Sequence, residues 1–211
     1  PSRCEGMQGR TDYVEALERW DRELVWHAFT QMAEYEPLIV ERARGCVLVD
    51  VQGREFLDGV SSLWCNVHGH RHPHLDAALR RQLDEVAHVT LLGSAHPTTI
   101  QLARRLVEVS PALLQHVFFS SDGSSSVEVA LKMACQYWGN QGQRRQTFIG
   151  LRHAYHGDTV GAMSAGARGV FNQAYEPLLF DVVRIPFPST GKEQAMTITG
   201  GSALSKDDIS R

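Results

Sequence analysis

Apolar residues in the first 110 positions recur at helical spacing, then at strand spacing, then at helical spacing again. A helical period predicts an amphipathic helix over residues 13–26, opened by Thr11 or Asp12. Three short apolar runs then predict a small antiparallel meander with strands at 38–40, 46–49 and 55–58, and a turn at Gln52-Gly53. Two further helices are predicted at 73–86 and 96–110, each opened at or beside a proline.

The segment 117–138 changes from strand to loop to helix. Residues 117–119 suit a short buried strand, and a Ser/Gly loop follows them. Ser125 and Glu128 have the spacing of a capping box, which marks the start of a helix. The predicted buried face of that helix consists of Val127, Ala130, Leu131, Ala134, Cys135 and Trp138.

Strands and helices alternate from Pro73 onward. The next predicted strands are 147–151 and 182–185, with a short helix at 158–164 between them, and residues 189–211 are expected to form a surface loop. This alternation favours an α/β layer with a parallel sheet. We therefore expect a small domain at 1–72, with the first helix and the meander, and the first part of a larger domain at 73–211.

Composition and charge narrow the range of partners. Apolar residues make up 43% of the 211 residues and charged residues 21%, as in ordinary soluble globular proteins. A net charge of −3 gives no reason to expect nucleic acid or a membrane surface as a partner, and no apolar run could span a bilayer. The four cysteines are widely spaced, which favours free thiols in a reducing compartment, the cytoplasm. The chain starts at Pro1 and stops after a polar run, so we expect both ends to be cut.

Two predicted strand exits hold the candidate chemistry, because ligands of parallel sheets bind beyond the carboxyl ends of strands. The loop 120–126 offers hydroxyls and the N–H groups of a helix start, which suit a phosphate. A structural loop that precedes a capped helix and binds no ligand explains the same residues, and it is the commoner case. At the second exit, Tyr155 suits stacking on a planar cofactor, with His156 beside it. Asp158 suits either an amine or the role of helix N-cap.

Four alternating histidines provide a different hypothesis, a metal-binding module. They are His68, His70, His72 and His74. Gly69 and Pro73 interrupt regular geometry there, and no acidic or cysteine ligand lies nearby at metal spacing, so packed imidazoles are the favoured interpretation. Trp64, in the same loop, either walls a substrate pocket or packs between layers.

Lysine is scarce in this chain, which contains only Lys132, Lys192 and Lys206. Lys132 follows Glu128 by four residues, the spacing of a stabilising pair on a solvated helix face. A lysine that forms a Schiff base needs a desolvated site, so all three are poor candidates for that role.

Taken together, several segments resemble one family. They are WH at 26–27 with FTQM at 29–32, DGVSSLW at 58–64 with HG at 68–69, DGS at 122–124 with VEVA at 127–130, KM at 132–133 and QYW at 136–138, and YHGDT at 155–159. The set is similar to the N-terminal half of the adenosylmethionine–8-amino-7-oxononanoate aminotransferases, which are class III, fold type I enzymes dependent on pyridoxal 5'-phosphate. The resemblance implies an N-terminal helix and an antiparallel meander, followed by part of a large α/β domain with a mostly parallel sheet.

The resemblance also implies which residues hold the cofactor. Gly123 and Ser124 match the loop that binds the cofactor phosphate, and Tyr155 matches the aromatic residue stacked on the pyridine ring, with His156 adjacent. The family's Schiff-base lysine and pyridine-pairing aspartate are expected beyond Arg211. The chain is therefore expected to contain no catalytic residue and to be inactive by itself.

A second group of residues is implied to bind substrate. Trp64 and Asp158 match positions that line the substrate pocket. Phe29 and Leu63 stand where some members have Tyr and Trp, and the loss of the Tyr hydroxyl removes a polar contact from the pocket.

The implied activity is amino transfer to 8-amino-7-oxononanoate, which gives 7,8-diaminononanoate in biotin biosynthesis. S-adenosylmethionine is the expected amino donor, and lysine is the donor in some relatives. Another class III ω-aminotransferase is the second hypothesis, and the metal-binding module is the third. The implied partners are these small molecules and, for the full-length protein, a second copy in a homodimer.

Overall fold

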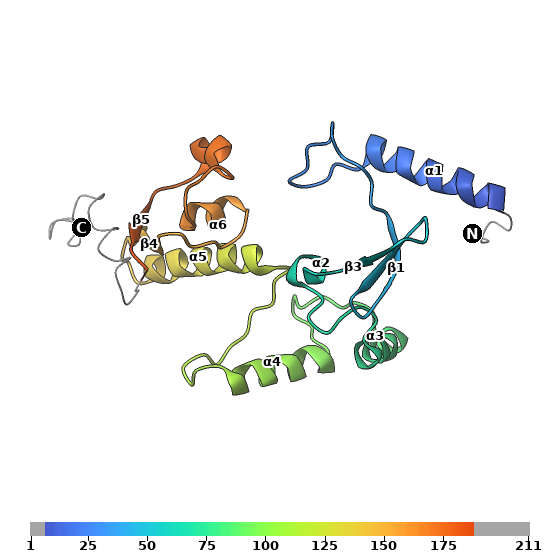
Figure 1. Ribbon diagram of the computed structural model, residues 1–211. Coiled ribbons are helices and arrows are strands. Elements are labelled where there is room, and N and C mark those ends of the chain that lie inside the picture. Colours follow the sequence, from blue (N-terminus) through green and yellow to red (C-terminus); the bar gives the residue numbers. More distant parts are fainter. Residues whose placement is uncertain (1–6, 188–211) are drawn as a thin grey trace. The chain divides into compact units, whose positions relative to one another are not determined.

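The computed structural model describes residues 7–187, whose helices and strands are shown in Figure 1. The chain divides into two compact units, residues 1–97 and 98–211. The predicted boundary between a small domain and the first part of a larger one, at residues 72/73, stays a prediction. The predicted loop at 189–211, Lys192, Lys206 and Cys4 all lie outside the described residues. None of the described helices has the length and apolar character needed to cross a bilayer.

The first unit contains a long helix and the predicted meander. The helix α1 (Met7–Leu24) starts before Thr11 and Asp12, so the prediction that either residue opens it is wrong. The strands β1 (Val40–Arg44), β2 (Val47–Asp50) and β3 (Glu55–Leu57) form an antiparallel sheet in that order. The first strand lies later than predicted, because the residues that pair with β2 are those up to Arg44, opposite Val47.

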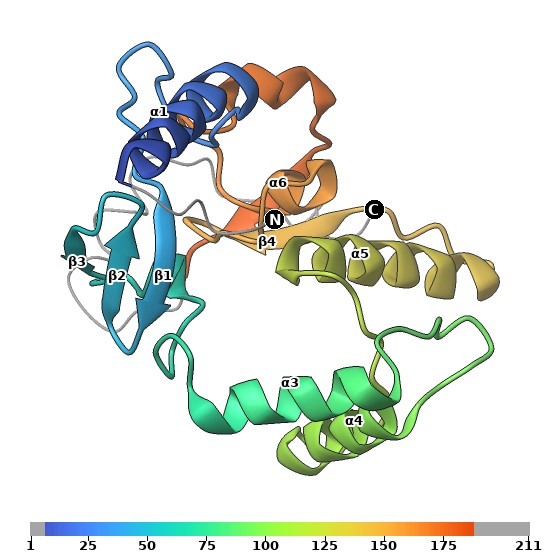
Figure 2. The same cartoon turned by 90° about the vertical axis from the view of Figure 1, so that its right-hand side faces the viewer.

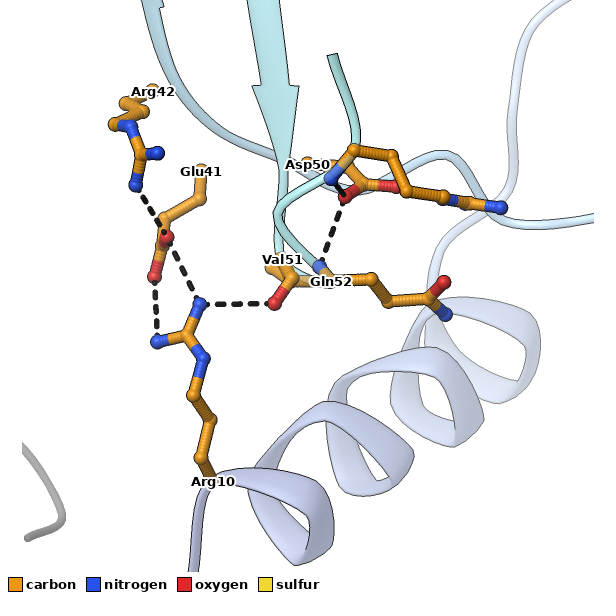
Figure 3. A network of polar contacts seen from close by, with 7 residues as sticks. Arg10, Glu41, Arg42, Asp50, Val51 and Gln52 are labelled. Atoms are coloured by element: carbon orange, nitrogen blue, oxygen red, sulfur yellow. Dashed lines mark hydrogen bonds and ion pairs between the residues drawn. The ribbon is translucent and has the colours of Figure 1, made fainter. Parts of the chain in front are cut away.

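Arg10 and Asp50 fasten the turn after β2 (Figure 3). From α1, Arg10 pairs with Glu41 at 3.2 Å and donates a hydrogen bond to the carbonyl oxygen of Val51 at 3.0 Å. The side chain of Asp50 is only 1% exposed, and it accepts hydrogen bonds from the N–H groups of Gln52 and Arg54 and from Arg54 Nε. Burial raises the pKa of the Asp50 carboxyl, but Arg54 and the two N–H groups outweigh it and hold that pKa below its usual value.

The two proline-opened helices are confirmed. Helix α3 (Pro73–Glu85) has Pro73 at its first turn and His72 at the N-cap position, and helix α4 (Pro97–Val109) begins at Pro97. Proline suits these starts, because its fixed φ is helical and its missing N–H would have no partner in the first turn. Neither helix contains a buried residue in the described structure.

The second unit contains the parallel strands. After α5 (Gly123–Asn140), β4 (Phe148–Leu151) pairs with β5 (Val182–Ile185) in parallel, which confirms the predicted parallel sheet. Between these strands lie α6 (Val160–Ala165) and a 3₁₀ helix, η1 (Gln173–Leu178). Helix α6 contacts both α5 and β4 (Figure 2). This contact brings the start of α5 close to the loop that leaves β4.

Two predictions for the second unit are wrong. Residues 117–119 form no strand, because none of the strands among the described residues pairs with them. The predicted buried face of α5 is at most half-buried: Val127, Leu131 and Trp138 are half-buried, and Ala130, Ala134 and Cys135 are exposed. Among the described elements only α6 makes extensive contact with α5, so most of that face lacks a covering layer.

Gly150 in β4 offers a test of the packing between β4 and α6. A Cβ at this position would lie 2.6 Å from the carbonyl oxygen of Ala165 and 3.3 Å from Cγ1 of Val182. We expect Gly150→Ala to lower the free energy of unfolding by about 2 kcal/mol, because a backbone oxygen cannot swing aside. Gly139→Ala in α5 is the matched control, since no atom lies within 4 Å of its added methyl group. Urea unfolding measures both variants, and equal losses would contradict this account.

Candidate functional site

Asp122 sets the start of α5. Its side chain accepts hydrogen bonds from the N–H group of Ser125 at 2.7 Å and from Ser125 Oγ at 3.0 Å, so Gly123 becomes the first helical residue. These bonds, led by the one from the N–H group, hold the pKa of Asp122 below its usual value. The capping box predicted at Ser125 is therefore wrong. A carboxylate three residues earlier takes the N–H that the N-cap must satisfy.

Ser124 joins this helix start to the loop that leaves β4. Its Oγ lies 2.8 Å from Thr159 Oγ1 and accepts a hydrogen bond from the Thr159 N–H at 3.1 Å. Gly157, with a φ of +116°, passes so close that a Cβ there would overlap the Ser124 side chain. The two predicted strand-exit segments therefore lie side by side, although 35 residues separate Ser124 from Thr159.

Tyr155 and Asp158 form a pair on the same loop. The Tyr155 hydroxyl donates a hydrogen bond to Asp158 Oδ2 at 2.8 Å, while the tyrosine as a whole is 73% exposed. This bond, which uses the phenolic proton, raises the pKa of Tyr155 above its usual value. Asp158 does not cap α6, because Thr159 occupies the N-cap position. His156 lies between them in sequence and is exposed.

Glu128 is a residue whose role the sequence did not reveal. Its Oε1 accepts hydrogen bonds from the N–H groups of Gly161 at 2.6 Å and Ala162 at 3.2 Å. A hydrogen bond with the Thr159 side chain, together with these two, outweighs burial and lowers the pKa of Glu128. Lys132, one turn along α5, adds a favourable charge and is itself exposed. The Glu128–Lys132 spacing is visible in the sequence, but the contact with Gly161 depends on tertiary structure.

The predicted substrate residues belong to the first unit, apart from Asp158. Leu63 and Trp64 lie on the short turn α2 (Ser61–Trp64), and they are 68% and 78% exposed. All four residues of this turn have φ between 46° and 70°, the left-handed region that non-glycine residues rarely adopt. Phe29 has a φ of 52° and is also exposed. The structure therefore holds Leu63 and Trp64 outward on an uncommon turn.

Asp58 anchors that turn. Its carboxylate accepts hydrogen bonds from the N–H of Ser62 at 2.8 Å and from Ser62 Oγ at 2.9 Å, and it lies 2.7 Å from His70 Nε2. The Ser62 N–H and then His70 are the main reasons that the pKa of Asp58 falls to about 2. His70 also pairs with Gly45 through two backbone hydrogen bonds, which ties the turn to the meander.

The histidine segment does not form a ligand cluster in the described structure. The rings of His68 and His72 lie 5.8 Å apart, and His70 binds Asp58. No three His, Cys, Asp or Glu side chains within residues 7–187 converge as metal ligands would. The metal-binding hypothesis therefore gains no support from the structure.

Comparison with known proteins shows which family this sequence resembles. The family model "Aminotransferase class-III" matches residues 30–206. Adenosylmethionine-8-amino-7-oxononanoate aminotransferase from Aquifex aeolicus is 51% identical over 178 residues, which cover 82% of this chain and 39% of the relative. The protein of the same name from Nitratidesulfovibrio vulgaris is 52% identical over 178 residues, which cover 82% and 33%. The chain spans about two fifths of the length of the relatives of this name from Aquifex aeolicus, Anoxybacillus flavithermus and Staphylococcus aureus.

Solved structures agree with this pattern. The adenosylmethionine-8-amino-7-oxononanoate aminotransferase of Methanocaldococcus jannaschii is similar with a TM-score of 0.78 and 44% identity, over 82% of this chain and 40% of that one. An (S)-enantioselective omega-transaminase from Thermomicrobium roseum has a TM-score of 0.75 and 34% identity, over 82% and 40%. These similarities confirm the predicted fold class, the α/β fold of fold type I transaminases. Because the family model covers most of its length, the chain belongs to the class III aminotransferases.

Proposed function

We propose that this chain is the N-terminal, cofactor-holding part of an aminotransferase that converts 8-amino-7-oxononanoate to 7,8-diaminononanoate in biotin biosynthesis. Two relatives of that name, more than half identical to the chain over 178 residues, support the substrate. One observation carries the proposal: the first turn of α5 and the Tyr155 loop are joined through Ser124 and Thr159. That junction puts a phosphate-type helix start beside an exposed aromatic ring.

The residues present fit pyridoxal 5'-phosphate. The start of α5 offers N–H donors and the positive end of the helix dipole, and Ser124 adds a hydroxyl. Apart from its chain neighbours and the backbone of its own helix, no atom lies within 4 Å of the place where a Cβ of Gly123 would sit, so a phosphate oxygen can approach the backbone there. Tyr155 offers an exposed ring whose hydroxyl is fixed by Asp158.

Each residue then has a separate task. When bound, the cofactor supplies an electron-withdrawing ring for the carbon that gains or loses the amino group. Gly123 and Ser124 hold the phosphate, and Tyr155 stacks on the ring with His156 beside it. The residues proposed to line the substrate pocket are Asp158, Trp64, Leu63 and Phe29. We further propose S-adenosylmethionine as the donor, a homodimer for the full-length protein and a cytoplasmic location.

Binding of pyridoxamine 5'-phosphate to the 211-residue chain tests the cofactor residues. This ligand is suitable because it lacks the aldehyde that reacts with any lysine. We expect Ser124→Ala and Tyr155→Ala each to raise the dissociation constant about tenfold, through a lost phosphate hydrogen bond and a lost stacking surface. Tyr137→Ala is the matched control, an exposed tyrosine later in α5. Equal affinity for pyridoxamine and its phosphate ester would contradict the phosphate site.

The substrate requires a separate experiment on the full-length protein. Amino transfer to 8-amino-7-oxononanoate with S-adenosylmethionine or lysine is compared with transfer to simple ketones. The similarity to the Thermomicrobium roseum omega-transaminase, at 34% identity, makes another ω-amine substrate the second candidate. Turnover of simple ketones without turnover of 8-amino-7-oxononanoate would favour that candidate. The complementary test measures amino transfer by the 211-residue chain with pyridoxal phosphate and then traps any imine with borohydride. Turnover before reduction, together with a specific reduced adduct on Lys132, Lys192 or Lys206, would contradict the expected inactivity.

A further inference from the structure

Helix α6 is capped by a residue from another helix. Thr159 occupies its N-cap position but makes no side-chain capping hydrogen bond to the helix. The Glu128 carboxylate, 33 residues away in α5, instead accepts hydrogen bonds from the N–H groups of Gly161 and Ala162. These are the second and third residues of α6, whose N–H groups an N-cap side chain normally satisfies.

Gly161 makes this contact possible. A Cβ on Gly161 would overlap the Glu128 carboxylate, with Glu128 Cδ only 2.8 Å away. Ala162 is fully buried, so its N–H group cannot turn to water for a replacement hydrogen bond. Glu128 and Gly161 are therefore complementary in shape as well as in charge.

The opposite end of α6 is held by positive charge. Arg184 donates hydrogen bonds to the carbonyl oxygens of Ser164 at 3.0 Å and Gly166 at 2.9 Å. Arg168 donates to the carbonyl oxygen of Met163 at 3.2 Å. A carboxylate at the N-terminus and guanidinium groups at the C-terminus both oppose the helix dipole. A six-residue helix is thus fixed at both ends by groups from outside it.

This arrangement gives Glu128 a place in the function of the loop. Residues 152–159, which include Tyr155, connect β4 to α6, so the position of α6 helps to determine where Tyr155 lies. We propose that Glu128 is a positioning residue, which fixes α6 on α5 and thereby holds Tyr155 at a set place relative to Ser124. The consequence for the cofactor rests on the proposed function, whereas the positioning itself does not.

The test compares Glu128→Ala with the conservative Glu128→Gln in the 211-residue chain. NMR records the amide exchange of Ala162 and the chemical shifts of residues 155–159, and titration gives the dissociation constant of pyridoxamine 5'-phosphate. In Glu128→Ala we expect at least tenfold faster exchange of the Ala162 amide, shifted resonances at Tyr155 and about tenfold weaker binding. Glu128→Gln keeps an oxygen acceptor, so its Ala162 exchange, Tyr155 resonances and dissociation constant should stay close to those of the wild-type chain. Glu108→Ala is the control, a helical glutamate paired with Arg104 and Arg105.

The readouts separate positioning from simple stability. A purely structural role would lower the urea midpoint of Glu128→Ala while the folded fraction kept wild-type Tyr155 resonances and affinity, and that result would overturn the proposal. If the wild-type chain does not bind pyridoxamine 5'-phosphate, the cofactor proposal fails, and the resonances of 155–159 alone decide the positioning role. If Glu128→Ala does not fold, Glu128→Asp, whose shorter side chain cannot reach both N–H groups, is compared with the wild-type chain. Faster Ala162 exchange with shifted Tyr155 resonances in Glu128→Asp then supports positioning, and faster Ala162 exchange with unchanged Tyr155 resonances overturns it.

Discussion

Gly157→Ala is expected to lower the free energy of unfolding of the second unit by about 3 kcal/mol. Two costs combine at this position. A φ of +116° lies in a region that side-chain-bearing residues rarely adopt, and the new Cβ would overlap the side chain of Ser124. The loop would have to move away from α5 to relieve both. The hydrogen bonds between Ser124 and Thr159 would then be broken.

Gly142→Ala separates the two costs. Gly142 also has a positive φ, +69°, but no atom lies within 4 Å of its would-be Cβ. Only the conformational cost applies there, about 1 kcal/mol. Urea unfolding of both variants gives the difference that belongs to the contact with Ser124. A loss at Gly157 no greater than that at Gly142 would show that the close approach to Ser124 contributes nothing to stability.

The parts of the fold that the sequence predicted depend on local rules. The helices that start at Pro73 and Pro97 are examples, because proline fixes its own φ. The meander is another, since Gly53 adopts a φ of +83° at the turn that Gln52-Gly53 predicts. Tyr155 could be found as a candidate because it follows a predicted apolar strand. Ser124 could be found because it lies at the start of a predicted amphipathic helix.

The parts that the sequence did not predict depend on contacts between distant residues. The sequence predicted a capping box at Ser125, whereas Asp122 is the N-cap, and both residues have suitable side chains within one turn. In the sequence, Glu128 is consistent with an ordinary solvated helix face. Only the structure shows that the Gly161 N–H donates a hydrogen bond to its carboxylate. The left-handed turn at Ser61–Trp64 contradicts the preferences of its own residues, and Asp58 and His70 stabilise it from outside. Roles in binding cofactor and substrate stay predictions for all eight candidate residues.

Asp58→Ala is expected to release the turn that carries Leu63 and Trp64. Four consecutive left-handed residues are unfavourable by roughly 1–2 kcal/mol each without glycine, so the turn needs external bonds to persist. The Asp58 carboxylate provides two of them through Ser62. Without it we expect Leu63 to return to a negative φ, which NMR couplings between Hα and the neighbouring backbone nuclei report directly. Asp76→Ala is the matched control, because that carboxylate pairs with Arg71 outside the turn.

The same turn should open in acid. Asp58 has a pKa of about 2 in the folded chain, below its ordinary value of 3.8, chiefly because the Ser62 N–H binds the charged carboxylate. A lowered pKa means that the ionised group stabilises the folded state; this contribution is complete above the ordinary value and is lost as the pH falls through about 2. The positive φ of Leu63 should therefore persist at pH 5 and disappear near pH 2, whereas Asp58→Asn, which keeps an acceptor for the Ser62 N–H, should show no such transition.

A turn that persists in Asp58→Ala at neutral pH would mean that the backbone bonds from Trp64 to Val60 and from Cys65 to Ser61 suffice to hold it.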